Sequence, residues 1–324
     1  MSTTILTDEA AQLAATVAEV AATWQLPDAG GLVSETEHFH DQWKVAEELG
    51  WTTILDDVDC TSFEALAESV DLIDAAAAVI RTLAHAGAAL PVRQALVARA
   101  LASEPVTTGP VVVSAHSFGV WDPIATVFVH GDGTTEDRAA QGSVDRDVAG
   151  RPLHRTDPPE DLGDRPDGVL AQFLLIQEIA GAARGAGEQA RAYASTRVQF
   201  GRPLIKLPAV AQELGRLTIA QRQLDGAIAE FARRLHTVDP ERIRFAATAA
   251  RALAGEVASD VAAQAHQLHG ALGLTADATL RHRTLLLWAD RDEGLHQRSW
   301  GVHTLPTREV DLWSLSQPEH THRL

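Results

Sequence analysis

The chain has 324 residues, of which 45% are hydrophobic and 22% are charged, as in an ordinary globular protein with room for two domains or one large one. Its formal net charge of −17 argues against nucleic acid or an anionic membrane as the main partner, because both require a basic surface. The single cysteine, Cys60, excludes an internal disulfide and fits a reducing compartment, and its acidic neighbours argue against a nucleophilic thiol.

No targeting or metal-binding signal stands out. Residues 1–11 have neither the basic region nor the apolar region of a signal peptide, and no run of 18 apolar residues occurs. We therefore predict no membrane span and a cytoplasmic location. The sequence has no HExxH or CxxC motif, so we predict no metal site.

Residues 1–104 are predicted to form an N-terminal helical domain. Apolar residues recur every three or four positions from Thr7 to Trp24 and from Phe39 to Gly50, which is the period of an amphipathic helix. A longer alanine-rich helix is predicted from Ser62, a suitable N-cap, to Gly87. Another helix is predicted from about Pro91 to Leu101.

The pattern changes at Pro105, where β-branched residues replace the helical period. The runs Val111–Val113 and Ile124–Val129 predict strands. Residues 142–168 are rich in Asp, Arg, Pro and Gly and predict a loop with room for a short strand. Residues 105–167 are therefore predicted to form a shortened β domain. The segment is too short for a separate barrel of eight strands.

Helical periodicity returns after residue 168 and predicts a C-terminal four-helix bundle over 168–305. Because the apolar seams are long and rich in alanine, we also expect oligomers formed through this bundle. Residues 306–324 are predicted to be a tail. The four helices are predicted from Val169 to about Ser195, from Pro208 to Leu235, from Asp239–Pro240 to Gly270, and from Thr279 to Ala289.

One candidate binding segment lies between the first two bundle helices. Arg197, Gln199 and Phe200 place a permanent cation, an amide and an aromatic ring within four residues. A guanidinium suits phosphate geometry and a ring offers a flat apolar face, so the segment could hold one end of a ligand with a phosphate and a ring. The alternative is a helix end with a solvated arginine and a phenylalanine in the core.

Two motifs together resemble the acyl-CoA dehydrogenase family. The first runs from Tyr193 to Pro203 (YASTRVQFGRP), and the second, about seventy residues later, runs from Gln267 to Thr275 (QLHGALGLT). The family has an N-terminal helical domain, a middle β-barrel and a C-terminal four-helix bundle. Its members use FAD to oxidise an acyl-CoA thioester to the 2,3-enoyl-CoA. The resemblance thus implies a mainly α fold with an abbreviated β segment.

The resemblance also implies roles for individual residues. Arg197 is expected to contact the FAD pyrophosphate of a neighbouring subunit, with Gln199 in the same motif and Phe200 packed beside that cofactor. Gln267 and the backbone of Gly270–Ala271 are expected to contact the ADP half. A guanidinium pairs well with phosphate oxygens, and a glycine-rich turn at a helix end allows close approach of an anion.

Departures from the family pattern change the expected function. The T-E-P-x-x-G-S-D element that cradles the flavin is absent between Pro105 and Gly168, Pro208 stands where a glutamine is usual, and Ala271 replaces the second glycine. The chain thus resembles the short subunits of heteromeric acyl-CoA dehydrogenases, which act on bulky steroid-derived CoA thioesters. That likeness implies a heterotetramer with a full-length partner subunit that shares its FAD, an acyl-CoA substrate and an acceptor of the electron-transfer flavoprotein type.

The catalytic base has one candidate. The family usually has a Glu-Gly pair after the last long helix, and Glu293–Gly294 lies one residue early, with Asp292 in place of the usual aromatic residue. At the other known location this chain has Ala171. Glu293 is therefore either the base or part of a solvated acidic helix end. Three functions stay open: a heteromeric subunit, a self-sufficient homo-oligomeric enzyme with Glu293 as base, and a non-catalytic helical scaffold.

Overall fold

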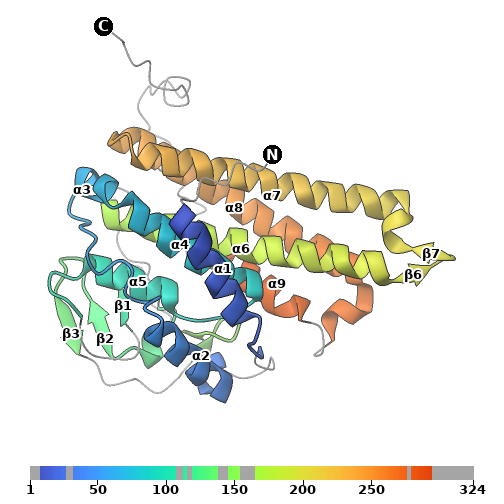
Figure 1. The fold of residues 1–324 in the computed structure, drawn as a ribbon, viewed down its shortest axis with the longest axis horizontal. Helices are drawn as coiled ribbons and strands as arrows, with labels where there is room; N and C mark the ends of the chain where they lie inside the picture. Colours follow the sequence, from blue (N-terminus) through green and yellow to red (C-terminus); the bar gives the residue numbers. More distant parts are fainter. Residues whose placement is uncertain are drawn as a thin grey trace, which may run out of the picture.

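The structure is a computed structural model. It describes residues 8–26, 32–106, 112–114, 119–137, 145–153, 165–275 and 279–293. Long helices dominate, and a small β segment lies beside one end of them (Figure 1). Within the described residues, none of the helices is long and apolar enough to cross a membrane.

The N-terminal segment is helical, as predicted, with one difference. The helix predicted from Ser62 to Gly87 is divided at Ser69, which departs from helical geometry (φ −103°, ψ 14°) and turns its hydroxyl back to the Ala65 carbonyl oxygen at 3.4 Å. Ser62 is the N-cap, as expected, and Gly87 ends the second part in a left-handed conformation. The helices are α1 (Asp8–Ala21), α2 (Glu37–Glu48), α3 (Phe63–Glu68), α4 (Val70–Ala86) and α5 (Val92–Leu101).

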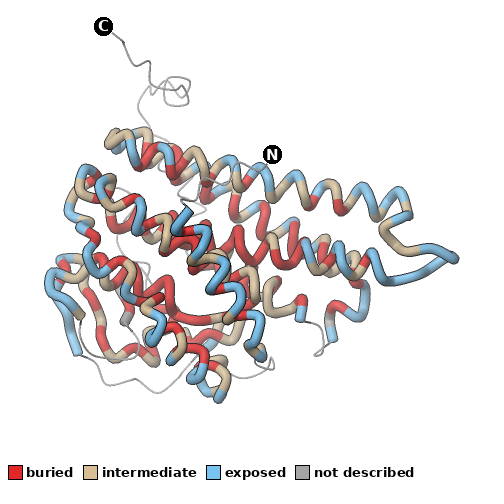
Figure 2. The backbone as a smooth tube through the Cα atoms, viewed as in Figure 1, coloured by how far each residue is buried: buried red, intermediate tan, exposed pale blue. Residues whose placement is uncertain are grey.

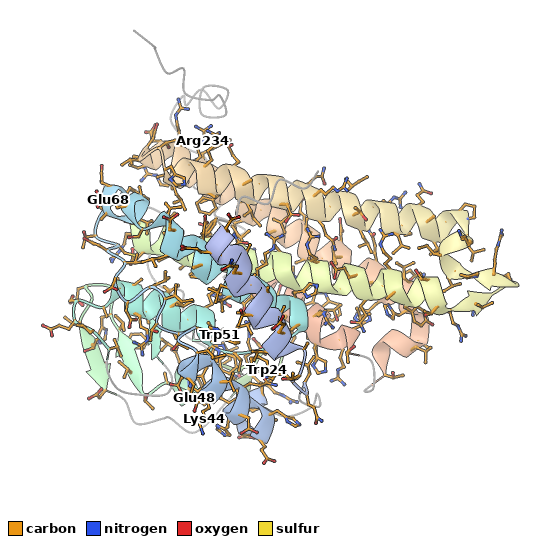
Figure 3. The ribbon with its side chains drawn as sticks, in the orientation of Figure 1. Trp24, Lys44, Glu48, Trp51, Glu68 and Arg234 are labelled. Carbon is orange, nitrogen blue, oxygen red and sulfur yellow. The ribbon has the colours of Figure 1, made fainter. Side chains whose placement is uncertain are left out.

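Two aromatic rings connect the ends of the first two helices. Trp24, just after α1, lies 6.1 Å from Trp51, just after α2, with the ring planes tilted by 52° (Figure 3). Trp51 is almost fully buried, so this contact closes one side of the N-terminal helices.

The middle segment forms a small sheet, as predicted, and a second strand pair within the residues predicted to be mainly loop. Strand β1 (Val112–Ser114) pairs parallel with β2 (Val127–Val129), which pairs antiparallel with β3 (Thr135–Asp137). A second pair joins β4 (Asp145–Arg146) to β5 (Pro152–Leu153). The strand predicted to begin at Ile124 begins three residues later, because Asp122–Ile124 forms a 3-10 turn with a proline at its start.

The C-terminal bundle agrees closely with the prediction. Its helices are α6 (Pro166–Thr196), α7 (Pro208–Leu235), α8 (Pro240–His269) and α9 (Leu280–Asp292). The Asp239 carboxylate caps α8 by accepting from the Glu241 and Arg242 amides at 3.1 and 3.2 Å. A short hairpin, β6 (Val198–Gln199) and β7 (Arg202–Pro203), followed by a 3-10 turn, Leu204–Lys206, joins α6 to α7.

Helix α6 lies at the centre of the molecule. It contacts α4 and α5 of the N-terminal segment and α7, α8 and α9 of the bundle. The buried apolar side chains form one continuous cluster that includes helices on both sides of the domain boundaries predicted at residues 104 and 168, and Figure 2 shows this buried centre along α6. The bundle and the N-terminal helices therefore share a single core.

The contact between α4 and α6 depends on glycine. A Cβ at Gly181 would lie 2.8 Å from the Arg81 carbonyl carbon and closer still to its oxygen, and Gly185 approaches the backbone of His85 in the same way. Ordinary contacts of a Cβ begin at 3.4 Å. These two positions of α6 therefore have no room for a side chain while α4 keeps its place.

Candidate functional site

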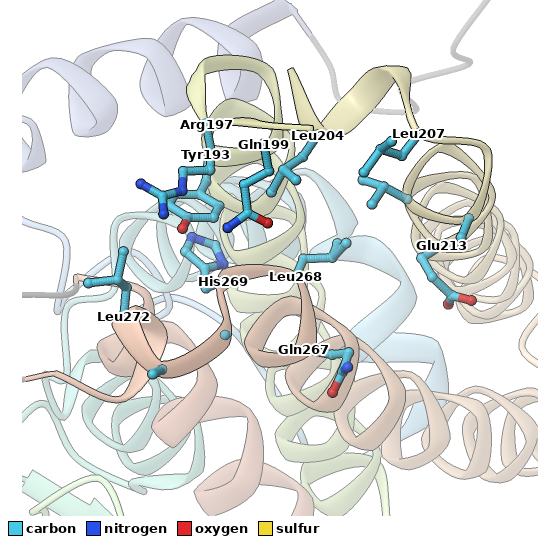
Figure 4. Close-up of a pocket in the computed structure, with 14 residues that line it drawn as sticks. Tyr193, Arg197, Gln199, Leu204, Leu207, Glu213, Gln267, Leu268, His269 and Leu272 are labelled. Carbon is cyan, nitrogen blue, oxygen red and sulfur yellow. The ribbon is translucent and has the colours of Figure 1, made fainter. Parts of the chain in front are cut away.

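The two sequence motifs meet at one cavity of about 560 Å³. The cavity lies between the end of α6, the β6–β7 hairpin, the start of α7 and the end of α8 (Figure 4). Every residue predicted to bind the cofactor lines it except Phe200. These lining residues are Arg197, Gln199, Gln267, Gly270 and Ala271.

The local backbone explains how Arg197 reaches the cavity. Helix α6 ends at Thr196 because Arg197 is extended (φ −71°, ψ 121°) and starts the hairpin. Its carbonyl oxygen accepts from the Leu204 amide at 2.9 Å, which fixes the base of the hairpin. Arg197 is exposed and lines the cavity, and no carboxylate of the described residues is paired with it. Its guanidinium is therefore available to bind an anion.

Phe200 occupies the tip of the hairpin. It is 86% exposed and has a positive φ of 51°, next to Gly201 with φ 75°. The hairpin projects beyond the bundle, at the end away from the small sheet (Figure 1). The alternative interpretation of Phe200 as a core residue is therefore wrong, because the chain itself buries almost none of this ring.

The turn after α8 has a backbone conformation that favours glycine. Gly270 has φ 61° and ψ −147°, a region almost restricted to glycine. Its amide donates to the His266 carbonyl oxygen, so it is not free for a ligand. A ligand at this turn would therefore depend on the Ala271 backbone and the exposed Gln267 amide. Glu213, paired with Arg216 at 2.7 Å, also lines the cavity and adds one negative charge.

Sequence reasoning missed a ring stack in the wall of the cavity. The His269 and Tyr193 rings lie 4.5 Å apart with planes 20° from parallel, and they connect the ends of α8 and α6. His269 Nδ1 donates to the Ala265 carbonyl oxygen at 2.8 Å, and burial lowers the pKa of the ring. His269 is therefore neutral at neutral pH. Both residues belong to the motifs, but nothing in their spacing indicates that the rings stack.

A family profile matches the part of the chain that carries this cavity. The profile described as "Acyl-CoA dehydrogenase, C-terminal domain" covers residues 172–289, from α6 to α9. This segment matches the acyl-CoA dehydrogenase C-terminal domain. The acyl-CoA dehydrogenase resemblance predicted from the two motifs is thus confirmed, and both motifs lie inside the matched residues.

Relatives agree with this assignment. Acyl-CoA dehydrogenase FadE34 of Mycobacterium tuberculosis (strain ATCC 25618 / H37Rv) is 33% identical over 106 residues, which are 33% of this chain and only 15% of that protein. The ChsE4–ChsE5 complex from Mycobacterium tuberculosis superposes with a TM-score of 0.67 at 17% identity, over 91% of this chain and 95% of the other. A variant of the Tcur3481–Tcur3483 steroid ACAD gives 0.65 at 18% identity, over 88% and 93%. The acyl-CoA dehydrogenase fold thus extends over most of the chain.

Glu293, the candidate base, lies at the end of α9 and does not line the cavity. Its Oε2 is 2.6 Å from Arg93 Nη2, and its side chain is 1% exposed. The alternative interpretation of Glu293 as part of a solvated helix end is therefore wrong. Its role as a base stays a prediction.

The acyl-CoA dehydrogenase fold of this chain also contains a buried group of charges that sequence reasoning did not predict. We call it the junction cluster, because it lies where α5, the β4–β5 turn, α6, α8 and α9 meet. Its members are Arg93, Asp147, Arg151, Glu178, Arg251, Asp290 and Glu293.

Two further features bear on earlier predictions. Burial raises the pKa of the Cys60 thiol to about 12, and the Asp167 and Asp59 charges act in the same direction, so the predicted effect of acidic neighbours is confirmed. Among the residues that the structure describes, no group of three or more His, Cys, Asp or Glu residues could hold a metal ion.

Proposed function

We propose that this chain is a subunit of an FAD-dependent acyl-CoA dehydrogenase and completes the FAD site of a full-length partner subunit. The observation that carries the proposal is the Arg197 guanidinium, which lines an open cavity and is paired with no carboxylate of the described residues, next to a hairpin whose Phe200 is 86% exposed. A cation available for an anion, beside an uncovered aromatic ring, is what one half of a shared binding site would offer.

The cavity fits part of a dinucleotide. Arg197 would bind the pyrophosphate oxygens, and Gln199 and Gln267 would supply amide hydrogen bonds around it. The Tyr193–His269 stack gives the cavity a flat aromatic wall. FAD, when bound, supplies the hydride acceptor for the oxidation of the acyl-CoA. This chain's residues bind and orient one end of it.

The exposed apolar side chains support an assembly. Val198 is 58% exposed and Leu272 is 51% exposed, on the hairpin and on the turn after α8 respectively. Together with Phe200 they offer apolar surface around the cavity that a partner subunit would cover. The similar ChsE4–ChsE5 structure is a complex of two different chains, which supports a heteromer here. The similar steroid ACAD supports a steroid-derived acyl-CoA as substrate. The acceptor of the electron-transfer flavoprotein type rests on the family resemblance alone.

Two alternatives make different demands on the chain. A self-sufficient homo-oligomer needs Glu293 to act as base, although Arg93 holds its carboxylate in a buried ion pair. A non-catalytic scaffold needs no cation in the cavity, and Arg197, which no carboxylate in the described part of the chain neutralises, argues against it. The heteromeric subunit uses both features as they stand.

Co-expression tests the proposal. The chain is expressed alone and together with the full-length homologue encoded beside it, and flavin absorbance and acyl-CoA-dependent dye reduction are recorded. We expect flavin only in the complex, and its loss in Arg197→Ala. Arg191→Ala, six residues earlier on the exposed face of α6, is the matched control and should retain flavin.

The other outcomes decide between the alternatives. Yellow, active protein from this chain alone would contradict the heteromeric function. No flavin in either preparation would favour the scaffold. Full activity of a Glu293→Gln complex would remove Glu293 as the base.

A further inference from the structure

The junction cluster is a buried feature of the fold to which the proposed function gives no part in binding or catalysis. Its arginines come from three separate segments: Arg93 from α5, Arg151 from the β4–β5 turn and Arg251 from α8. All of them are buried. A buried charge must be paired, so the carboxylates around them decide whether this junction is stable.

Arg93 is bound by two carboxylates. Its Nε lies 2.5 Å from Glu178 Oε2 on α6, and its Nη2 lies 2.6 Å from Glu293 Oε2. The three side chains are between 1% and 8% exposed. These short, nearly dry ion pairs hold α5 against both the first and the last helix of the bundle, and they raise the pKa of the guanidinium.

Arg151 connects the middle segment to the end of α9. Its Nε lies 2.6 Å from Asp147 Oδ2, and its Nη1 lies 2.7 Å from Asp290 Oδ1. Its Nη2 is 3.5 Å from Glu293 Oε2. Asp147 also accepts hydrogen bonds from the amides of Ala149 and Arg151, so the backbone of the turn itself stabilises its carboxylate.

Arg251 acts on the backbone rather than on a carboxylate. Its Nη2 donates to the carbonyl oxygens of Asp290, Arg291 and Glu293 at 3.1 to 3.2 Å. These carbonyls belong to the last turn of α9, where a cation is favourable. Arg251 therefore fixes the segment that carries both acidic members of the cluster on α9.

The charges of the cluster do not balance if every group is ionised, because three guanidiniums face four carboxylates. Asp290 is the least compensated carboxylate: its side chain is 0% exposed, and its Oδ2 has no hydrogen-bond partner among the described residues. Asp147, in contrast, is 13% exposed and receives two amides. The excess negative charge thus falls on Asp290.

We propose that the junction cluster carries one proton on Asp290, taken up when the chain folds, while Glu178 and Glu293 are the carboxylate partners of Arg93. Burial raises the pKa of Asp290 well above its usual range, and Glu178 and Glu293 add to this shift, against Arg151 and Arg93. Arg251 and Asp147 complete the charged groups that face the cluster.

The sign of the effect on stability follows from linkage. In the unfolded chain Asp290 ionises near its ordinary pKa, whereas in the folded chain it keeps its proton to higher pH. Its contribution to stability is therefore complete below the unfolded pKa and is lost as pH rises through the folded pKa. In this arrangement Glu293 is a structural counter-ion, because removing its carboxylate would leave Arg93 with half of its pairing.

Thermal unfolding between pH 5 and 9 tests the proposal on the full chain. The variants are Asp290→Asn, which imitates the protonated carboxyl, and Glu293→Gln, with the part-exposed Asp292→Asn as the matched control. We expect wild type to lose roughly 2–4 °C of Tm per pH unit relative to Asp290→Asn over part of this range. We expect Glu293→Gln to lose roughly 5–10 °C throughout and Asp292→Asn to follow wild type.

Parallel Tm curves of wild type and Asp290→Asn over the whole range would overturn the proposal, and so would equal losses in Asp290→Asn and Glu293→Gln. A second measurement does not require the variants to fold. The infrared band of a protonated carboxyl group should be present in folded wild type at pH 7 and vanish on unfolding, and its absence from the folded protein would also overturn the proposal. Neither measurement involves flavin, so its result is independent of the proposed function.

Discussion

A single methyl group at Gly181 should separate the two helices that make the centre of the core. In Gly181→Ala the new Cβ would meet the carbonyl carbon of Arg81 at 2.8 Å and its Cα at 3.0 Å, where ordinary contacts begin at 3.4 Å. These are backbone atoms of α4, so no side chain can rotate away. Helix α4 or α6 must move instead, and both are buried along this contact.

The magnitude follows from two opposing terms. Overpacking a core costs about 1–3 kcal/mol, and the upper end applies because the obstacle is backbone. Alanine is better than glycine inside a helix by about 0.8–1 kcal/mol. The free energy of unfolding of Gly181→Ala should therefore fall by about 2 kcal/mol, which corresponds to a loss of roughly 4 °C or more in Tm.

Urea unfolding followed by circular dichroism measures this change. Gly226→Ala is the matched control, because Gly226 also lies inside a long helix but has nothing within 4 Å of its Cβ position. There only the helix term acts, and stability should rise by up to about 1 kcal/mol. If Gly181→Ala were as stable as Gly226→Ala, the close approach of α4 and α6 would be refuted.

Three further changes test local features. Asp239→Ala removes the cap of α8 and should lower the free energy of unfolding by about 1 kcal/mol in urea titrations, whereas Asp239→Asn should not; equal losses would exclude a capping role. Cys60 should resist iodoacetamide at pH 8 until urea is added, since burial raises its pKa to about 12; equal rates with and without urea would count against this. Burial raises the pKa of Asp74 to about 6, so its protonated form is stabilising at low pH and that contribution is lost as pH rises through 6. The free energy of unfolding of Asp74→Asn should therefore exceed that of wild type by up to about 1 kcal/mol above pH 6, a gain limited by the partial exposure of the side chain. Near pH 4 the two proteins should be equally stable, and a difference that did not depend on pH would contradict this.

The bundle was predictable because its helices carry their own boundaries. Helix α7 begins at Pro208 and ends at Leu235, as its apolar seam predicts, and α8 follows an Asp–Pro pair that caps it. The division at Ser69 was not predictable in the same way, because the helical period continues across it. The predicted start of the strand at Ile124 was wrong, because the turn that contains Pro123 outweighs the β propensity of these residues.

The candidate site was predictable only in part. The two motifs identify the residues that line the cavity, but the exposure of Phe200 and the stack of Tyr193 on His269 depend on how helix ends meet. The junction cluster could not be predicted from the sequence. The residues that Arg93 binds lie 85 and 200 positions away in the sequence, and no periodicity states which distant charges will pair.

The hairpin between α6 and α7 has a consequence for the amount of this chain that a cell can maintain. Phe200 at its tip is exposed, and Arg197 at its base lines the cavity. In the proposed assembly, the partner subunit would therefore cover the ring and bring a ligand to the guanidinium in the same step. A chain without its partner keeps an exposed apolar hairpin tip, which favours self-association and degradation by proteases. The cellular amount of this chain would then follow the supply of partner and flavin rather than its own rate of synthesis.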